Sequence, residues 1–487
     1  MPVEAAALLH QFERIVHATP DRTLIHIPAT GDALKAGDIW SAHTEYARLL
    51  SDAGVGAHQL VLSAAGNHAE AVGLLLAARA IGAALLAVDA GATPPEIFQL
   101  ADRFGAAALV LPDAMCEAPP SDIAIGSVLS SGLRVAIRLT SSPSTYPDAA
   151  ILKLTSGSTA APKATLTTED QLIADGTHII AAMGIQPADT QIAAIPVSHS
   201  YGLGNLVMPL LLQGTAIVLR ESFIPPFLPD DAIRYGARVF AGVPFMFQFF
   251  IANPPATGWP PCLTHLISAG APLTAETVRL FHDRFGIKIH SFYGASETGG
   301  ITFDAGDDMP AGTVGLPLPG VTLALKPDRD LPAGAGRIHV QSAAVARGYS
   351  DGTRDGFDAD GFLTGDYGAI DEAGRLTLLG RVSSFVNVAG RKVQPEEVEQ
   401  VLRTMPGVAD VRVLAAPDAQ RGQQIVACIV RGAGTTSTLD VRQYCASRLA
   451  AFKIPRCVIF LDVMPMTPRG KTDRAALDGL VRERLAE

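Results

Sequence analysis

The sequence predicts an α/β fold, and three features of the chain indicate it. Segments typical of helices alternate with short, continuous apolar runs through most of the first 300 residues. Such alternation is typical of parallel strands that are covered on both faces by helices. From about Gly312 to Gly380 the pattern changes to short strands separated by Gly and Asp turns, and after Arg381 a separate α+β unit begins.

The large N-terminal body is predicted from helical windows that each precede an apolar run. The pairs are EYARLLSDAG and QLVLSAA, AEAVGLLLAARAIG and ALLAVDA, and EIFQLADRFGA and AALVLPD. After Leu154 five more apolar runs follow, QIAAIPV, TAIVLR, ARVFAGVP, LTHLISAG and IKIHSFYG. Runs without polar alternation indicate buried strands, so we expect mostly parallel sheets here.

The remainder of the chain predicts two smaller pieces. GRIHVQS, GFLTGDYGAID and GRLTLLGR favour an antiparallel, β-barrel-like region from about residue 312. The residues after Arg381 are expected to form helix, strand, strand, helix and strand, with GRVSSF as the hinge. We therefore expect a body over residues 1–380, a hinge at about 381–384 and a small C-terminal domain over 384–487.

Composition limits the classes of function. The chain has 487 residues, of which 48% are hydrophobic, so two or three domains with large cores are expected. Its net charge is −10 and it has no dense basic run, which argues against a nucleic-acid surface. The five cysteines are scattered, which favours a reducing cytoplasm, and no secretory signal is expected at the N-terminus. The longest apolar run is broken by Arg79 and Asp89, so no membrane insertion is expected.

The segment LTSGSTAAPKAT has the composition of a phosphate-binding loop. Such a loop needs inward backbone N–H groups, hydroxyl donors and a cation. The residues that would supply them are Thr155, Ser156, Gly157, Ser158, Thr159 and Lys163. The segment does not match the Walker pattern, and on composition alone a flexible loop is the simpler interpretation.

Four further segments follow in a fixed order. They are IPVSHSYGLGN (195–205), FYGASETGG (292–300), LTGDYG (363–368) with LLGRVSSFVNVAGRKVQPEEVE (378–399), and PMTPRGKTDR (465–474). With these segments the chain resembles the superfamily of acyl-CoA synthetases, nonribosomal-peptide adenylation domains and firefly-type luciferases, and the acyl- or aryl-CoA ligases most. The resemblance implies a mobile C-terminal domain that closes an active-site cleft. It also implies ATP-dependent conversion of a carboxylic acid to acyl-AMP and pyrophosphate, followed by transfer of the acyl group to a thiol.

The resemblance further implies roles for the residues of the N-terminal body. The loop from Thr155 to Lys163 would hold the β- and γ-phosphates of ATP, and Glu297 would bind Mg²⁺. Ser296 would place a hydroxyl near the α-phosphate, and His199 would orient or gate the substrate carboxylate. The residues expected beside the adenine are Tyr293, Gly294, Gly270, Ala271 and Pro272.

Other implied roles fall later in the chain. Asp366 would accept the ribose hydroxyls, with Arg381 nearby. Lys471 would reach the substrate carboxylate and the α-phosphate during adenylation only, and Gly390 would let a pantetheine arm pass close to the backbone.

Some positions depart from the family pattern. Ala160 and Ala164 stand where glycine is usual, and alanine is strained at positive φ, so the loop could differ in shape and bind ATP more weakly. Ser383 and Asn387 replace the usual hinge Asp or Lys and a lysine, which bears on the timing of domain rotation.

The sequence leaves alternatives for substrate and acceptor. IPVSHSYG has no carboxylate to pair an α-amine, so an aliphatic or aromatic acid without an α-amino group is expected. The segment AGVPFMFQFF (241–250) fits either an apolar acid pocket or a core helix. The acceptor thiol could belong to CoA or to the phosphopantetheine of a carrier protein. The altered loop and hinge also leave open a catalytically degenerate nucleotide-binding protein.

Overall fold

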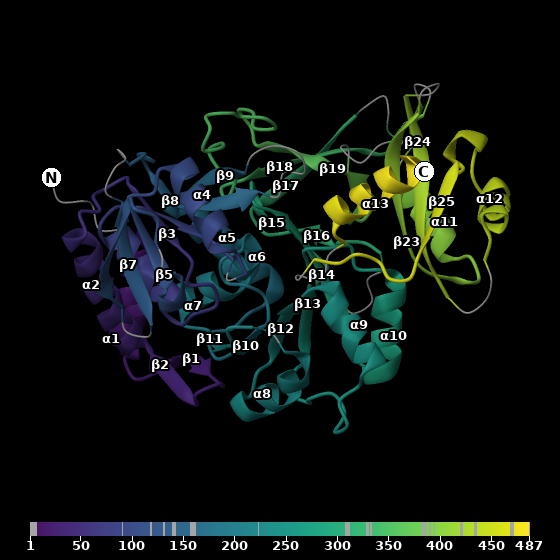
Figure 1. Cartoon of the computed structure of the whole chain (residues 1–487). Helices are drawn as coiled ribbons and strands as arrows, with labels where there is room; N and C mark the ends of the chain where they lie inside the picture. The colour runs from purple at the N-terminus through teal and green to yellow at the C-terminus, as the bar shows by residue number, and fades with distance from the viewer. Residues whose placement is uncertain are drawn as a thin grey trace. The chain divides into compact units, whose positions relative to one another are not determined.

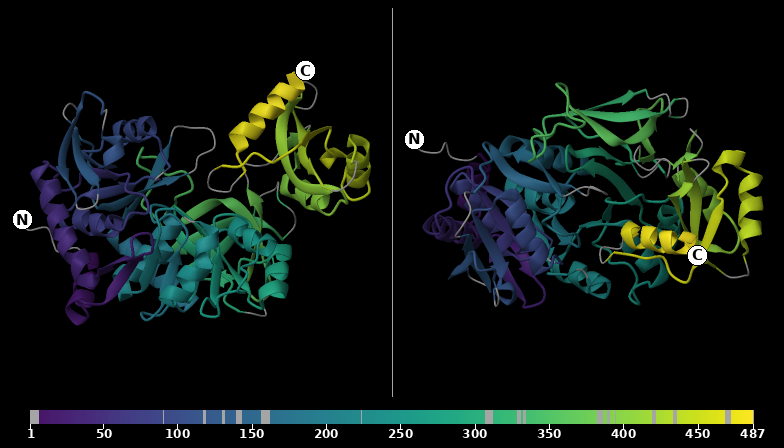
Figure 2. Two further views of the ribbon diagram at one scale, coloured as in Figure 1. Left: turned by 60° about the horizontal axis from the view of Figure 1, so that its bottom comes forward. Right: turned by 45° about the horizontal axis from the view of Figure 1, so that its top comes forward.

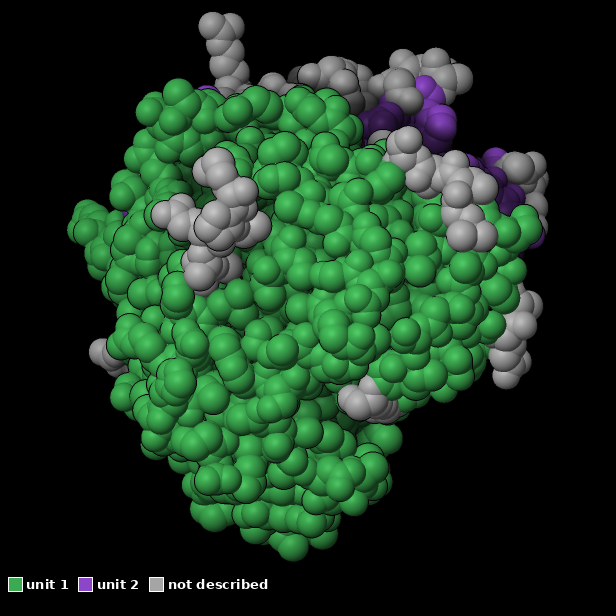
Figure 3. Space-filling view, turned by 90° about the vertical axis from the view of Figure 1, so that its left-hand side faces the viewer, with its two compact units in different colours: residues 1–323, 339–363, 371–376 green, residues 324–338, 364–370, 377–487 purple. Residues whose placement is uncertain are grey.

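A computed structural model describes most of the chain. The described residues are 7–89, 91–116, 119–129, 132–138, 143–155, 162–222, 224–306, 312–327, 331, 334–381, 386–388, 391–393, 395–418, 422–432, 436–467 and 472–486. The chain divides into two compact units (Figure 3). Unit 1 comprises Met1–Leu323, His339–Leu363 and Asp371–Leu376, and unit 2 comprises Ala324–Ile338, Thr364–Ile370 and Thr377–Glu487. The predicted domain limits at 380 and 384, with the hinge between them, stay predictions.

The described part of unit 1 contains two large sheets. The seven-stranded sheet has the order β6-β7-β5-β3-β4-β8-β9, and the nine-stranded sheet has the order β16-β15-β14-β13-β12-β10-β11-β1-β2. The first consists of β3 (Leu60–Ser63), β4 (Ala84–Ala87), β5 (Ala108–Pro112), β6 (Ile123–Val128), β7 (Leu133–Arg138), β8 (Ala149–Thr155) and β9 (Lys163–Thr168). The second consists of β1 (Thr23–Ile27), β2 (Asp32–Lys35), β10 (Thr190–Ala193), β11 (Ala216–Leu219), β12 (Val239–Gly242), β13 (His265–Ser268), β14 (Ile289–Ala295), β15 (Gly299–Phe303) and β16 (Leu316–Pro317).

Helices cover both faces of each sheet in unit 1 (Figure 1). One core joins the two sheets through α1 (Ala7–Ala18), α2 (Ala36–Asp52), α3 (Glu70–Ala80), α5 (Glu169–Met183) and α7 (Met208–Gln213). The outer face of the seven-stranded sheet packs on α4 (Pro94–Phe104). The outer face of the nine-stranded sheet packs on α8 (Leu228–Tyr235), α9 (Pro244–Ala252) and α10 (Ala275–Phe285). Val61 of β3 belongs to the shared core while Leu60 and Leu62 belong to the outer one, as the two-residue period of a strand requires.

The β-rich region is a four-stranded sheet with the order β17-β18-β19-β20. Its strands are β17 (Val321–Lys326), β18 (Gly336–Ser342), β19 (Phe362–Ile370) and β20 (Leu376–Arg381). The expected change to short strands is therefore confirmed. Within the described residues this sheet has two edge strands, β17 and β20, so it is an open sheet and not a closed barrel.

Unit 2 contains a five-stranded sheet covered on both faces. Its strands are β21 (Val386–Val388), β22 (Arg391–Val393), β23 (Val408–Asp418), β24 (Gly422–Arg431) and β25 (Cys457–Leu461). Helices α11 (Pro395–Arg403) and α12 (Thr438–Ala446) pack on one face, and α13 (Arg474–Ala486) packs on the other (Figure 2). Along β24, Ile425 and Ala427 face the first core, while Val426 and Cys428 face the second.

All eight apolar runs quoted above contain strands. The order helix, strand, strand, helix, strand is found from α11 to β25, but the hairpin β21–β22 before it and helix α13 after it were not predicted. The sequence reasoning missed the β1–β2 hairpin and the antiparallel strands β6, β7 and β9 at the edges of the seven-stranded sheet. AGVPFMFQFF forms β12 and the core helix α9, whose Phe247 and Phe250 are buried beside Trp259 and Phe281. No helix in the described ranges is both long and apolar enough to span a membrane.

Candidate active site

Strand β10 is a topological switch point of the nine-stranded sheet. It pairs in parallel with β11 on one side and with β12 on the other, so the chain reverses its direction across the sheet here. In α/β sheets, ligands bind at the carboxyl ends of the strands beside such a point. The segment that leaves β10 at this end contains His199 and Ser200. The fold therefore places a predicted site segment where a ligand is expected.

His199 and Ser200 connect this segment to two distant parts of unit 1. Nε2 of His199 lies 2.9 Å from Oδ2 of Asp89, a residue that follows β4 of the other sheet. Oγ of Ser200 lies 3.0 Å from Oγ of Ser296. Ser200 begins the short helix α6 (Ser200–Gly202), which continues into a π-helical segment (Leu203–Val207). Two of the predicted segments, 195–205 and 292–300, are thus in contact.

Glu297 and Lys163 both contact the side chain of Tyr349. The hydroxyl of Tyr349 donates to Oε1 of Glu297 at 2.9 Å, and Nζ of Lys163 lies 5.4 Å from the centre of the Tyr349 ring. Burial and the Glu297 carboxylate both raise the pKa of Tyr349, so it stays a neutral donor. Tyr349 was not predicted as a site residue, although RGYS follows the predicted strand GRIHVQS closely in the sequence.

Lys163 is held by a turn that the sequence analysis also missed. Its Nζ lies 3.0 Å from Oδ2 of Asp351, 3.0 Å from Oγ1 of Thr353 and 3.8 Å from Oδ2 of Asp355. The Thr353 hydroxyl and backbone N–H, together with Lys163, lower the pKa of Asp351 to about 2. An ordered cation with a three-residue cradle can exchange its carboxylate partner for a phosphate oxygen.

The two ends of the predicted phosphate loop lie side by side. Thr155 and Lys163 are partners in the β8–β9 pairing, and the Thr155 hydroxyl donates to the Lys163 carbonyl at 3.2 Å. Ser156, Gly157, Ser158, Thr159 and Ala160 lie outside the described residues. Ala164 is fully buried on β9 and does not have positive φ, so the expected strain at this position is wrong. An extended strand accepts alanine without cost, whereas a left-handed turn would not.

The residues expected beside adenine follow neighbouring strands at one edge of the sheet. Gly270, with φ of +79°, and the exposed Ala271 and Pro272 follow β13. Tyr293 lies on the adjacent β14 and is 8% exposed. Gly294 must be glycine, because a Cβ there would lie 2.6 Å from the Gly299 carbonyl oxygen across the β14–β15 pair.

Unit 2 contains the predicted ribose-binding pair. Nε of Arg381, at the end of β20, lies 3.0 Å from Oδ1 of Asp366 on β19, and the two side chains are 63% and 16% exposed. Both were predicted, and this ion pair brings them together. Gly390, Ser383 and Lys471 lie outside the described residues, as does the side chain of Asn387.

A buried lysine lies behind the predicted metal-binding residue. Lys153 on β8 is 5% exposed, and Asp175 on α5 is 4% exposed. Burial lowers the pKa of Lys153 and raises that of Asp175, while the carboxylates of Asp175 and Glu297 oppose the loss of charge on the lysine. Asp175 accepts from the Gly300 N–H at 2.8 Å and so supports the turn that follows Glu297. A charge within the apolar run AAILKL was the signal that could have found Lys153.

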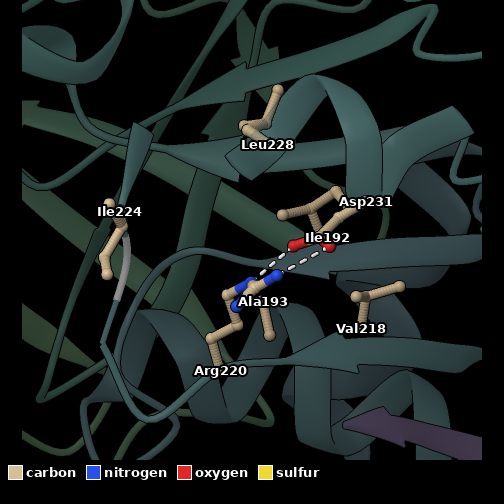
Figure 4. Close-up of a pocket in the computed structure, with 7 residues that line it drawn as sticks. All are labelled: Ile192, Ala193, Val218, Arg220, Ile224, Leu228 and Asp231. Atoms are coloured by element: carbon tan, nitrogen blue, oxygen red, sulfur yellow. Dashed lines mark hydrogen bonds and ion pairs between the residues drawn. The ribbon is translucent and has the colours of Figure 1, made fainter. Parts of the chain in front are cut away.

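A small hollow at the ends of β10 and β11 is occupied by an ion pair (Figure 4). Arg220 contacts Asp231 through two bonds of 2.6 and 2.9 Å, and its guanidinium lies 4.6 Å from the centre of the Phe227 ring. The Asp231 carboxylate raises the pKa of Arg220. Because the Arg220 guanidinium is engaged by its own carboxylate partner, this hollow is not assigned a ligand.

Comparison with known proteins identifies the family. The AMP-binding enzyme family matches residues 12–350, and the AMP-binding enzyme C-terminal domain matches residues 397–471. A sulfoacetate–CoA ligase of Cupriavidus necator is 29% identical over 489 residues, with 94% of each chain covered. An oxalate–CoA ligase of Arabidopsis thaliana is 27% identical, with 95% of this chain and 96% of the relative covered.

Solved structures agree with this match. ATP-bound MatB from Rhodopseudomonas palustris has a TM-score of 0.81 at 25% identity, with 98% of this chain and 99% of that chain covered. The predicted fold class, a large α/β body with a smaller C-terminal domain, is confirmed, and so is the predicted enzyme class, an AMP-forming ligase near the acyl-CoA ligases. With more than half of its length matched by one family, the chain belongs to the AMP-binding enzymes.

Proposed function

We propose that this enzyme activates a small carboxylic acid, aliphatic or aromatic and without an α-amino group, and transfers the acyl group to CoA. The family match supports ATP and CoA as reactants. The relatives named for sulfoacetate and oxalate support a small acid without an amine. The segment 195–205 has no carboxylate of its own to pair with an amine.

The observation that carries the proposal is the chain of contacts from Lys163 through Tyr349 to Glu297. It joins a cation suited to phosphate with a carboxylate suited to a hard metal ion. Ser296 lies beside Glu297 in the sequence and contacts Ser200. A phosphate chain bound along these groups would have its charge offset by Lys163 and would lie close to the segment with His199.

Mg²⁺ is proposed to bind at Glu297. The donor set fits this ion, because Mg²⁺ is commonly held by one or two carboxylates together with substrate phosphates and water. In the described ranges no group of three or more His, Cys, Asp or Glu side chains is placed to hold a metal ion. When bound, Mg²⁺ would offset negative charge on the triphosphate.

The other predicted residues are assigned their proposed roles on the same basis. Thr155, Ser156, Gly157, Ser158 and Thr159 would bind phosphate. Gly270, Ala271, Pro272, Tyr293 and Gly294 would bind the adenine, and Asp366 with Arg381 the ribose. Lys471 would pair the substrate carboxylate with the α-phosphate, and Gly390 would lie along the pantetheine arm.

The chemistry proceeds in two balanced steps. A carboxylate oxygen of the acid attacks the α-phosphorus, the bond to the bridging oxygen breaks, and pyrophosphate leaves. The sulfur of CoA then attacks the acyl carbon, AMP leaves, and the thiol proton passes to a base. Holding two anions together by cations is the main requirement of the first step. We propose a cytoplasmic location for the enzyme, and its five cysteines are free thiols as a reducing compartment requires.

The test is acid-dependent exchange of pyrophosphate into ATP over a panel of small acids. Exchange with at least one acid supports the proposal, and none over a broad panel would favour a catalytically degenerate nucleotide-binding protein. Lys471→Ala is expected to abolish exchange while sparing thioester formation from supplied acyl-adenylate. Lys326→Ala, which removes an exposed lysine on β17, is the control. CoA and a phosphopantetheinylated carrier protein are compared as acceptors, and preference for the carrier would replace CoA in the proposal.

A further inference from the structure

One ring nitrogen of His199 is paired with a carboxylate, and the other is accessible. Nε2 lies 2.9 Å from Oδ2 of Asp89, whose other oxygen, Oδ1, accepts from the Gly91 N–H at 2.8 Å. Among the described residues, Nδ1 of His199 has no hydrogen-bond partner, and the side chain is 39% exposed. The Asp89 side chain is 19% exposed.

The carboxylate determines which nitrogen carries the proton. An ionised carboxylate only accepts hydrogen bonds, so the nitrogen that faces it must donate. Asp89 therefore favours the tautomer with hydrogen on Nε2, and this tautomer leaves a lone pair on the open Nδ1. A neutral His199 thus presents a hydrogen-bond and proton acceptor on its accessible side.

Among the reactants of the proposed function, the thiol is the one that must lose a proton. The carboxylate and the triphosphate react as anions, whereas a thiol reacts as its thiolate. His199 immediately precedes Ser200, whose hydroxyl contacts Ser296 beside the proposed metal ligand. A proton acceptor at this place matches the requirement of the second half-reaction, in which the thiol loses its proton.

We propose that Asp89 is a positioning residue that holds His199 as the proton acceptor for the thiol, an inference that rests on the proposed function. As the sulfur bonds to the acyl carbon, the S–H bond breaks and its proton moves to Nδ1 of His199. The bond between the acyl carbon and the AMP oxygen breaks, and AMP leaves as its anion. Asp89 contacts neither reactant and acts through the ring.

The decisive variant is Asp89→Asn. The amide keeps an oxygen for the Gly91 N–H and turns its NH₂ group toward Nε2, so the ring must place its proton on Nδ1. Pyrophosphate exchange is expected to stay within about threefold of the wild type. Thioester formation from supplied acyl-adenylate is expected to fall on the order of 100-fold at pH 7, as for loss of a general base. The deficit should narrow above about pH 8.5, where a thiol ionises without help.

A matched control exists in the same unit. Nε2 of His339 lies 2.9 Å from Oδ2 of Asp358, and Oδ1 of Asp358 accepts from the Asp360 N–H at 2.9 Å. Asp358→Asn makes the same chemical change at a pair without a predicted site role, and both half-reactions are expected at the wild-type rate. In thioester formation, His199→Ala should lose as much activity as Asp89→Asn, and the double variant should lose nothing further.

The outcomes separate the inference from the proposed function. Equal losses in both half-reactions for Asp89→Asn would make Asp89 a structural residue, and no loss in thioester formation would exclude His199 as the acceptor. If Asp89→Asn does not fold, His199→Ala is decisive, since it truncates a partly exposed ring. If the wild type exchanges no pyrophosphate with any acid, the proposed function fails, while thioester formation from supplied acyl-adenylate still tests the inference.

Discussion

Replacing Gly299 by alanine tests whether Asp175 supports the turn that follows Glu297. Gly299 has φ of +70°, and a Cβ there would lie within 2.7 Å of the Asp175 carboxyl carbon and both of its oxygens. Asp175 is 4% exposed and accepts from the adjacent Gly300 N–H at 2.8 Å. The methyl group would therefore displace the carboxylate from its bond.

The expected magnitude follows from two separate costs. A left-handed alanine costs about 1–2 kcal/mol. Loss of a hydrogen bond to a buried carboxylate costs about 1.5–3 kcal/mol more. Gly286 isolates the first cost, because its φ is +72° and no atom lies within 4 Å of a Cβ built there. We expect Gly286→Ala to lose about 1–2 kcal/mol and Gly299→Ala about 2.5–5 kcal/mol.

Urea unfolding followed by tryptophan fluorescence measures this difference. Both tryptophans of the chain, Trp40 and Trp259, belong to unit 1, so the signal reports that unit alone. Equal stability of the two alanine variants would refute the reasoning, because it would mean that the carboxylate moves aside without loss. Pyrophosphate exchange should also fall in Gly299→Ala and not in Gly286→Ala.

Three further predictions concern charge. Lys153→Met should lower the free energy of unfolding of unit 1 by about 1–3 kcal/mol in the same fluorescence assay, because the buried Asp175 would lose the nearby positive charge that favours its ionised form; an unchanged free energy of unfolding would contradict this. Asp351→Asn should lower the KM for ATP in pyrophosphate exchange by roughly 2–5-fold, because it frees Lys163 from an ion pair whose carboxylate side chain is 33% exposed; a raised KM would mean that Asp351 aims the lysine correctly. Burial lowers the pKa of His265 to about 4 from the ordinary 6.5. Between these two pH values the unfolded chain binds a proton at this histidine that the folded chain does not. The free energy of unfolding of unit 1 should therefore fall by about 3 kcal/mol as the pH drops from 7 to 4. His265→Gln should flatten that part of the pH profile, and an unchanged profile would show that this histidine is already protonated in the fold.

Much of the architecture could be predicted because its causes are local. A buried parallel strand can be recognised from a short apolar run, and a helix from apolar residues that recur every three to four positions. The runs from QLVLSAA to IKIHSFYG are therefore found as strands. The antiparallel partners at the sheet edges escaped prediction. Strands such as β6 and β9 are only partly buried, and their pairing depends on which edge is free once the parallel strands have assembled.

The candidate site was likewise predicted from the sequence only in part. The sequence by itself determined which segments and residue types form it, since Lys163, Ser296, Glu297 and Asp366 lie in segments whose order resembles a known family. Only the tertiary structure showed that Tyr349 joins Lys163 to Glu297 and that Asp89 bonds to His199, 110 residues away. A hydrogen bond between distant residues leaves no periodic or compositional trace. The bond between Asp89 and His199 forms because the segments that follow β4 and β10, strands of separate sheets, are brought together, and that depends on how the whole core packs.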